Sequence, residues 1–150
     1  MREVLTKSMA RNIFYGGSLF FIFIFIALFI HGHWYIVNTS TDHAGLNDSI
    51  KRGKHVWEQK ACVNCHTILG EGAYFAPELG NVMARWGVDD DPEVAFDVLQ
   101  GWMEAQPSGA PGRRQMPQFH LSEEDLRGLT DFLLWVGKIN TQNWPPNELG

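Results

Sequence analysis

Charged residues and cysteines are both scarce in this sequence. Only 19% of its 150 residues are charged, with 12 basic against 17 acidic side chains. A chain of this length has room for one modest domain, which excludes a multidomain enzyme, and an acidic chain binds nucleic acid poorly. The hydrophobic content of 45% argues against disorder. Because there are only two cysteines, a structural zinc site would lack its second cysteine pair.

Charge is absent altogether from Ile13 to Ile30, a run of eighteen residues. A helix of that length extends about 27 Å, close to the roughly 30 Å hydrocarbon thickness of a bilayer. Basic residues precede the run, and Trp34 and Tyr35 follow it where interfacial aromatic residues are common. The positive-inside rule places the N-terminus in the cytoplasm and everything after Val37 outside it. No small-x-small cleavage motif follows the run, so we expect an uncleaved anchor rather than a signal peptide.

The sequence divides into three parts on these grounds. Residues 1–37 are expected to form a cytoplasmic N-terminus and a transmembrane anchor, residues 38–48 a polar linker, and residues 49–150 a folded domain. Residues 38–150 hold sixteen acidic and nine basic side chains, a net charge of −7. The part of the chain outside the membrane is therefore strongly acidic.

The first half of the folded domain predicts two helices. One carries Ile50, Gly53 and Trp57 at helical spacing, which puts a small residue and a large aromatic residue on one face. The second begins at Pro77, a favoured first helical position, and continues through Trp86.

Two further helices are marked by their capping residues. Asp91 is a typical N-cap with Pro92 at the first helical position, and apolar residues follow it at helical spacing. Ser122 begins a capping-box-like sequence before an apolar face that extends to Ile139. Neither a convincing alternating strand pattern nor an internal repeat is present in the sequence. We therefore expect an all-α fold.

Both cysteines belong to the sequence Cys62-Val-Asn-Cys65-His66. This pattern is typical of c-type haem attachment, in which both thiols form thioethers with the haem and the adjacent imidazole binds the iron. A redox dithiol would need a preceding strand in a βαβ unit, and it leaves His66 without a role. A disulfide within so short a loop would stabilise little. The motif therefore predicts one covalently bound haem c.

The second axial ligand of the iron decides whether the haem carries electrons or binds small molecules. The candidates are Met83, Met103, Met116 and His120. Met83 and Met103 lie at apolar positions of predicted helices, where methionine usually fills a core. Met116 ends the proline- and glycine-rich stretch Ala105–Pro117, from which a loop can reach across a haem. We expect Met116 to be the ligand, with His120 as its main rival.

The last hundred residues resemble class I cytochromes c. The resemblance rests on Gly53, Trp57, the Cys62–His66 motif, Pro77, Leu79, Met116, Phe132 and Trp135. It implies that the first and last helices cross at Gly53 against Phe132 and Trp135. It also implies that the carbonyl of Pro77 accepts a hydrogen bond from Nδ1 of His66 and so orients the ring.

A more specific resemblance covers nearly the whole chain. The continuous stretch from Trp57 to Leu79, together with the single N-terminal anchor, is similar to the cytochrome c subunits of bacterial nitric oxide reductases. That family lies in the bacterial inner membrane with its haem domain in the periplasm. Its cytochrome subunit passes electrons to a polytopic catalytic subunit, which contains haem b, haem b3 and non-haem iron and converts two NO to N2O and water. The resemblance also implies a calcium ion near the subunit interface, bound in part by the loop that contains Gly72 and Tyr74.

A haem with both axial positions filled holds one electron and offers a substrate no open position. The expected role is therefore an electron relay in nitric oxide reductase, with catalysis on the partner chain. A free-standing membrane-anchored shuttle and the monohaem subunit of a terminal oxidase are the alternatives. The acidic domain favours a basic electron donor, such as a small soluble cytochrome c or a cupredoxin.

Overall fold

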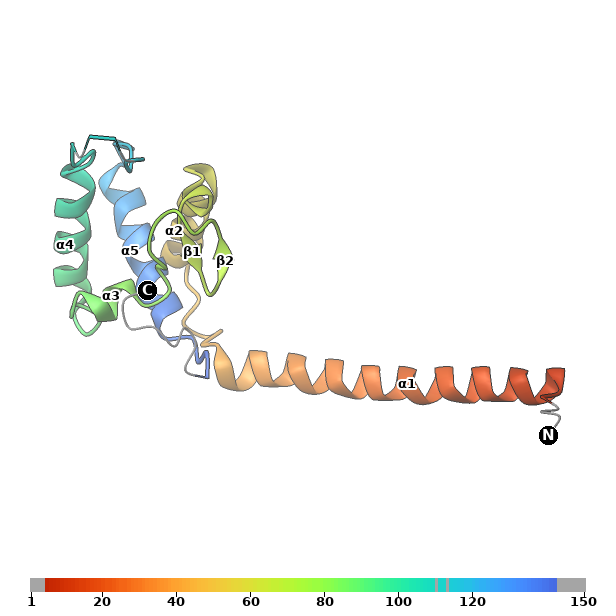
Figure 1. Cartoon of the computed structure of the whole chain (residues 1–150). Coiled ribbons are helices and arrows are strands. Elements are labelled where there is room, and N and C mark those ends of the chain that lie inside the picture. Colours follow the sequence, from red (N-terminus) through yellow and green to blue (C-terminus); the bar gives the residue numbers. More distant parts are fainter. Residues whose placement is uncertain (1–4, 110, 113, 143–150) are drawn as a thin grey trace. The chain divides into compact units, whose positions relative to one another are not determined.

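The computed structural model describes residues 5–109, 111–112 and 114–142, and the chain forms two compact units, residues 1–40 and 41–150 (Figure 1). The first unit consists of α1 (Lys7–Tyr35) and a π-helical turn, η1 (Ile36–Ser40). The Thr6 side chain caps α1 by accepting a hydrogen bond from the backbone N–H of Met9 at 3.2 Å. Within the described residues, Lys7–Ser40 is the one helical stretch long and apolar enough to cross a membrane. The sequence predicts such a helix at this place.

The second unit is mostly helical, as expected. Its main helices are α2 (Asp48–Gln59), α4 (Pro92–Glu104) and α5 (Glu123–Gly137), with a short α3 (Val82–Arg85) and a 3-10 turn, η2 (Cys62–Asn64). Two strands of two residues each, β1 (Thr67–Ile68) and β2 (Glu71–Gly72), pair antiparallel, with Thr67 opposite Gly72. Strands this short contain too few residues to show alternation in the sequence. The all-α fold class is confirmed.

The capping residues of α4 and α5 act as their sequence suggests. The Asp91 side chain accepts hydrogen bonds from the backbone N–H groups of Glu93 at 3.0 Å and Val94 at 3.3 Å. The Ser122 hydroxyl accepts one from Asp125 at 3.2 Å. These bonds satisfy helix N–H groups that have no partner within the helix. Both helices therefore begin where the caps predict.

Helices α2 and α5 cross in direct backbone contact. A Cβ atom placed on Gly53 would overlap the carbonyl of Gly128 and would lie 2.7 Å from Cβ of Phe132. Trp57, one turn further along α2, packs against the Phe132 ring with their centroids 6.5 Å apart. The expected contact between Gly53 and Phe132 is present, but its partner at the crossing is Gly128 rather than Trp135. The indole N–H of Trp135 instead donates to the carbonyl of Asp42 at 3.1 Å.

Helix α3 is much shorter than predicted, because the backbone near Pro77 is bound elsewhere. The expected helix begins at Pro77, whereas the observed one covers only Val82–Arg85. The Pro77 carbonyl accepts a hydrogen bond from His66, and the N–H of Leu79 donates to the carbonyl of Thr67 at 2.9 Å. These long-range bonds occupy the groups that would have formed the first helical turns. The prediction of a helix from Pro77 onward is therefore wrong.

Candidate cofactor site

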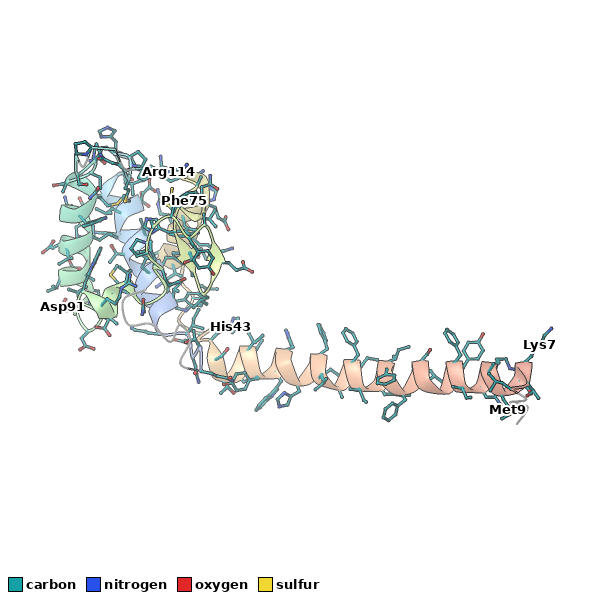
Figure 2. The ribbon with its side chains drawn as sticks, viewed as in Figure 1. Lys7, Met9, His43, Phe75, Asp91 and Arg114 are labelled. Carbon is teal, nitrogen blue, oxygen red and sulfur yellow. The ribbon has the colours of Figure 1, made fainter. Side chains whose placement is uncertain are left out.

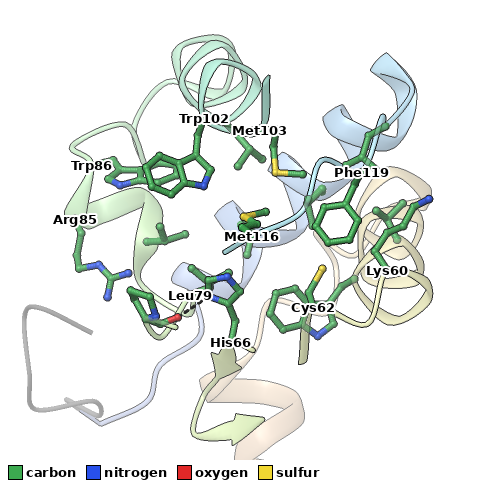
Figure 3. A pocket seen from close by; sticks show the side chains of 18 residues that line it. Lys60, Cys62, His66, Leu79, Arg85, Trp86, Trp102, Met103, Met116 and Phe119 are labelled. Carbon is green, nitrogen blue, oxygen red and sulfur yellow. Dashed lines mark hydrogen bonds between the residues drawn. The ribbon is translucent and has the colours of Figure 1, made fainter. Parts of the chain in front are cut away.

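A largely apolar cavity lies between α2, α3, α4, α5 and the segment that leads into α5 (Figure 3). It encloses about 830 Å³ with the open space at its mouth included. Of the described residues that line it, only Lys60 and Arg85 carry a formal charge. The wall is otherwise made mostly of aliphatic, aromatic and methionine side chains. Such a cavity suits a flat, mainly apolar group.

The Cys62–His66 motif forms a tight turn directly after α2. Ala61 adopts the left-handed conformation with φ 54° and thereby ends the helix. The carbonyl of Cys62 then accepts hydrogen bonds from the backbone N–H groups of Cys65 at 3.1 Å and His66 at 2.9 Å. As a result, Cys62 and His66 both line the cavity, while Cys65 lines an adjoining pocket together with them. Cys62 and Cys65 form no disulfide with each other.

Burial keeps the Cys62 thiol uncharged. Loss of contact with water raises the pKa of Cys62 to about 11, and the neighbouring Cys65 adds to the rise. Nearby Lys60 opposes the shift but does not cancel it. At neutral pH the sulfur that faces the cavity is therefore a thiol and not a thiolate.

The His66 ring is held by one hydrogen bond at its Nδ1 atom. Nδ1 donates to the carbonyl of Pro77 at 2.8 Å, as the resemblance to class I cytochromes c implies. With the proton fixed on Nδ1, Nε2 keeps its lone pair and can bind a metal. The Trp57 ring packs beside the imidazole with centroids 6.5 Å apart. The hydrogen bond thus fixes the tautomer of the imidazole, and the bond and the Trp57 contact together fix its position.

A buried carboxylate fixes the backbone that holds His66. Glu78 is only 6% exposed. Its Oε1 accepts hydrogen bonds from the N–H groups of Leu69 and Gly80, both at 2.8 Å, and its Oε2 accepts one from Gly70 at 3.3 Å. Because Glu78 follows Pro77 directly, these bonds anchor the carbonyl that accepts from His66.

Met116 lies on the cavity wall, between Trp102 and His66 in Figure 3. Met103 also lines the cavity, from the buried face of α4. Met83 is 1% exposed and belongs to the hydrophobic core. Neither Met83 nor His120 lines the cavity. The structure therefore places two of the candidate methionines, Met116 and Met103, on the cavity wall, and Met116 is the one supplied by a loop.

Arg85 brings an unsatisfied positive charge to the cavity. Its Nη2 donates to the carbonyl of Glu78 at 2.6 Å. Its Nη1 is buried and has no hydrogen-bond partner among the described residues. Burial lowers the pKa of Arg85, while the Glu78 charge raises it. Buried polar groups normally have a hydrogen-bond partner. An anionic group of a bound ligand, such as a haem propionate, would supply the partner that this nitrogen lacks.

Gly72 ends β2 and Tyr74 lies in the turn that follows it, both exposed. Gly72 has φ +132°, and a Cβ there would collide with the carbonyl of His66. The Tyr74 hydroxyl donates to the carbonyl of Gly70 at 3.1 Å. No group of three or more His, Cys, Asp or Glu that could hold a metal ion occurs among the residues the structure describes.

Several residues that line or support the cavity carry no signal in the sequence that marks them as functional. Glu78 and Arg85 acquire their roles from backbone groups distant in sequence, so no local pattern identifies them. Trp86 and Trp102 fit helical periodicity, which by itself indicates packing. Their ring centroids lie 5.9 Å apart, and both line the cavity.

The sequence profile of the cytochrome c family matches residues 50–137. The folded unit is thus a cytochrome c domain, which implies covalently bound haem c, and the cavity has the donor set for it. The chain is 63% identical to the nitric oxide reductase C-subunit of Paracoccus denitrificans and 60% identical to that of Cereibacter sphaeroides. The identity with the protein of Stutzerimonas stutzeri is 49%, and all three alignments cover both chains completely. The chain therefore belongs to the family of nitric oxide reductase C-subunits.

Proposed function

We propose that this chain is the one-electron relay of a nitric oxide reductase. The observation that carries the proposal is the convergence of Cys62, His66 and Met116 on one apolar cavity. In this proposal Cys62 and Cys65 would hold haem c through thioethers, and His66 and Met116 would bind its iron. When bound, haem c supplies a single reversible one-electron step.

The chain's own residues prepare the site for that step. Pro77 holds the Nδ1 proton of His66, so Nε2 is the nitrogen left to bind iron. The apolar wall excludes water and with it the solvent reorganisation that would slow electron transfer. Arg85 supplies a hydrogen-bond donor and a positive charge for a propionate. With His66 and Met116 both bound to the iron, the site would offer a substrate no open position.

Catalysis then belongs to another subunit. The relatives are named as subunits of nitric oxide reductase, and we propose that this chain passes its electrons to a polytopic subunit with haem b, haem b3 and non-haem iron. The long apolar helix α1 suggests membrane anchoring. We place the anchor in the bacterial inner membrane and the haem domain in the periplasm, because basic residues precede the helix.

The interface calcium ion remains a proposal from the family resemblance. Calcium takes about six to eight oxygen ligands. This chain would offer two, the carbonyl of Gly72 and an oxygen of Tyr74, both of which are exposed. The partner chain or haem groups would have to supply the others.

Purification of the native complex in mild detergent tests the proposal. The expected result is co-purification of a polytopic chain with b-type haems, one haem c per copy of this chain, and consumption of NO with electrons that enter through haem c. A chain that emerges alone with one haem c would support the free-standing shuttle instead. A partner that reduces oxygen but not NO would support the terminal oxidase.

A further inference from the structure

Helix α4 has an apolar face on its solvent side as well as on its core side. Val94, Val98 and Trp102 are spaced four residues apart and are 44%, 39% and 48% exposed. Gly101 and Ala105 are exposed on the same side. A surface helix normally turns polar residues to water. We call these five residues the α4 outer face.

The α4 outer face adjoins the cofactor cavity through two indoles. Trp86, Val98, Gly101, Trp102 and Ala105 line a shallow hollow open to solvent. Trp86 and Trp102 also line the cofactor cavity on their other side. Because the two rings line both spaces, they form the wall between the hollow and the cavity. Figure 3 shows the two rings side by side at the edge of the cavity. A molecule seated in the hollow would be separated from the cofactor by aromatic side chains.

Carboxylates border this face without matching cations. Asp89, Asp90 and Asp91 lead into α4, and Asp97 and Glu104 lie along one side of it. None of these five takes part in an ion pair among the described residues.

The acidic start of α5 is different, because two arginines pair with its carboxylates and neutralise it in part. Arg52 pairs with Glu124 at 2.8 Å and with Asp125 at 2.9 Å. Arg127 pairs with Glu123 at 3.1 Å and with Glu93 at 3.3 Å. Among the described residues, five carboxylates without an ion pair therefore lie in or next to α4, close to the apolar hollow.

The cavity edge near the cysteines has the opposite charge. Lys60 and Arg114 line the pocket that contains Cys65, and the Arg114 guanidinium lies 4.2 Å from the centroid of the Phe75 ring. Figure 2 shows Phe75 and Arg114 well separated from Asp91, which marks the start of α4. A basic partner would be attracted to the α4 side and repelled at the cysteine side.

We propose that the α4 outer face is the docking surface for a basic, soluble one-electron donor. The inference rests on the proposed relay function and adds to it where the electron arrives. One electron leaves the reduced metal centre of the donor, passes the Trp86–Trp102 wall and reduces the ferric haem. No bond is formed or broken and no proton is transferred.

Other occupants fit this surface less well. A second copy of the chain would bring the same carboxylates face to face, and like charges in apposition are unfavourable. An anionic membrane surface would be repelled for the same reason. Only three large apolar side chains, Val94, Val98 and Trp102, belong to the face, which suits a transient electron-transfer complex that buries less than about 1,200 Å².

Charge reversal on and off the face tests the proposal. The full haem-loaded chain in detergent is mixed in a stopped-flow instrument with a reduced, basic cytochrome c of the mitochondrial type. At low salt, Asp97→Lys should lower the second-order rate constant roughly three- to tenfold, because steering and docking both weaken. The control Glu71→Lys makes the same change of charge on exposed β2, which Figure 1 shows on the side of the domain away from α4. It should lower the rate constant by less than twofold.

Two further measurements separate the outcomes. Val98→Asp should slow the reaction with the basic donor even though it adds negative charge, because it breaks the apolar patch. If Asp97→Lys and Glu71→Lys lowered the rate constant equally, overall charge alone would explain the effect. If neither Asp97→Lys nor Val98→Asp changed the rate constant, the donor would dock elsewhere. If sedimentation showed that the wild-type chain forms dimers and that Val98→Asp does not, the face would instead bind a second copy of the chain. Reduction of each variant by dithionite, and co-purification of the polytopic chain, report on the relay function independently of where the donor docks.

Discussion

The side chain of Glu78 lies one residue beyond the carbonyl that orients His66. Three backbone N–H groups converge on its carboxylate, two of them from the turn between β1 and β2. A carboxylate accepts all three, whereas an amide can offer only one acceptor oxygen. The residue thus ties the loop after the haem motif to the segment before α3.

We expect Glu78→Gln to destabilise the haem-loaded chain by about 1–3 kcal/mol, since a buried N–H is left unpaired and an amide nitrogen faces it. Thermal unfolding followed by circular dichroism measures the loss. Glu71→Gln is the matched control, because Glu71 is exposed on β2, and it should stay within about 0.5 kcal/mol of the wild type. Equal stability of both variants would contradict a structural role for the Glu78 carboxylate.

The choice between the two cavity methionines can be made spectroscopically. Met116→Leu should abolish the sulfur-to-iron charge-transfer band of the oxidised protein, and Met103→Leu should keep it. Met116→His should restore a six-coordinate iron with a lower reduction potential, because imidazole donates more strongly than thioether to oxidised iron. A band that survives in Met116→Leu and disappears in Met103→Leu would reverse the assignment.

Arg85 offers a second control over the potential. Removing a positive charge near the haem stabilises the oxidised iron, so Arg85→Gln should lower the midpoint potential, while Arg85→Lys should lower it less. Redox titration of the purified chain measures both. If Arg85→Gln left the midpoint potential at its wild-type value, the guanidinium would not face the cofactor.

Among single residues, the sequence predicts those that belong to a recognisable motif. Cys62, Cys65 and His66 are adjacent in the chain, and Met116 stands out by its loop context. Glu78 and Arg85 could not be predicted in the same way. A carboxylate next to proline and an arginine on a helix are ordinary until folding brings the Leu69–Gly70 turn and the cavity to them.

At the scale of elements, the crossing of α2 and α5 depends on two glycines. We expect Gly53→Ala to lower stability by about 1–3 kcal/mol or more, because the new methyl group overlaps the Gly128 carbonyl. The loss should appear despite the roughly 1 kcal/mol that alanine gains over glycine within a helix. Denaturant unfolding of the haem-loaded chain measures it.

Gly101 provides the control for that experiment. It lies within α4, and a Cβ placed there meets no atom within 4 Å. Gly101→Ala should therefore stabilise the chain by roughly 0.5–1 kcal/mol. Stabilisation by both substitutions would mean that the two helices can separate without penalty.

Helix starts are predicted well where a cap is local and poorly where backbone groups bind at long range. Asp91 and Ser122 bond to N–H groups two or three residues ahead, so their sequences suffice. Pro77 has the composition of a helix start, but its carbonyl is taken by His66 eleven residues earlier. The close approach of Gly128 to Gly53 also escapes sequence analysis, because it depends on how two helices cross.

For the whole molecule, the uneven charge predicts salt-dependent kinetics. With a basic donor at limiting concentration, the rate of haem reduction should fall as ionic strength rises from about 0.01 M to 0.15 M, where the Debye length shortens from roughly 30 Å to 8 Å. Stopped-flow reduction at several salt concentrations measures this. A flat dependence would mean that apolar contact alone governs encounter.

The apolar cavity also has a consequence for biogenesis. Helices α2, α3, α4 and α5 all contribute side chains to its wall, among them Val56, Val82, Leu99 and Leu133. Empty space in an apolar interior is costly, at about 24 cal/mol for each Å³. A polypeptide that never receives haem would thus forfeit much of the packing between its helices and spend more time open to proteases. Haem supply would then set how many copies survive to join the complex, so that defective subunits are removed before assembly.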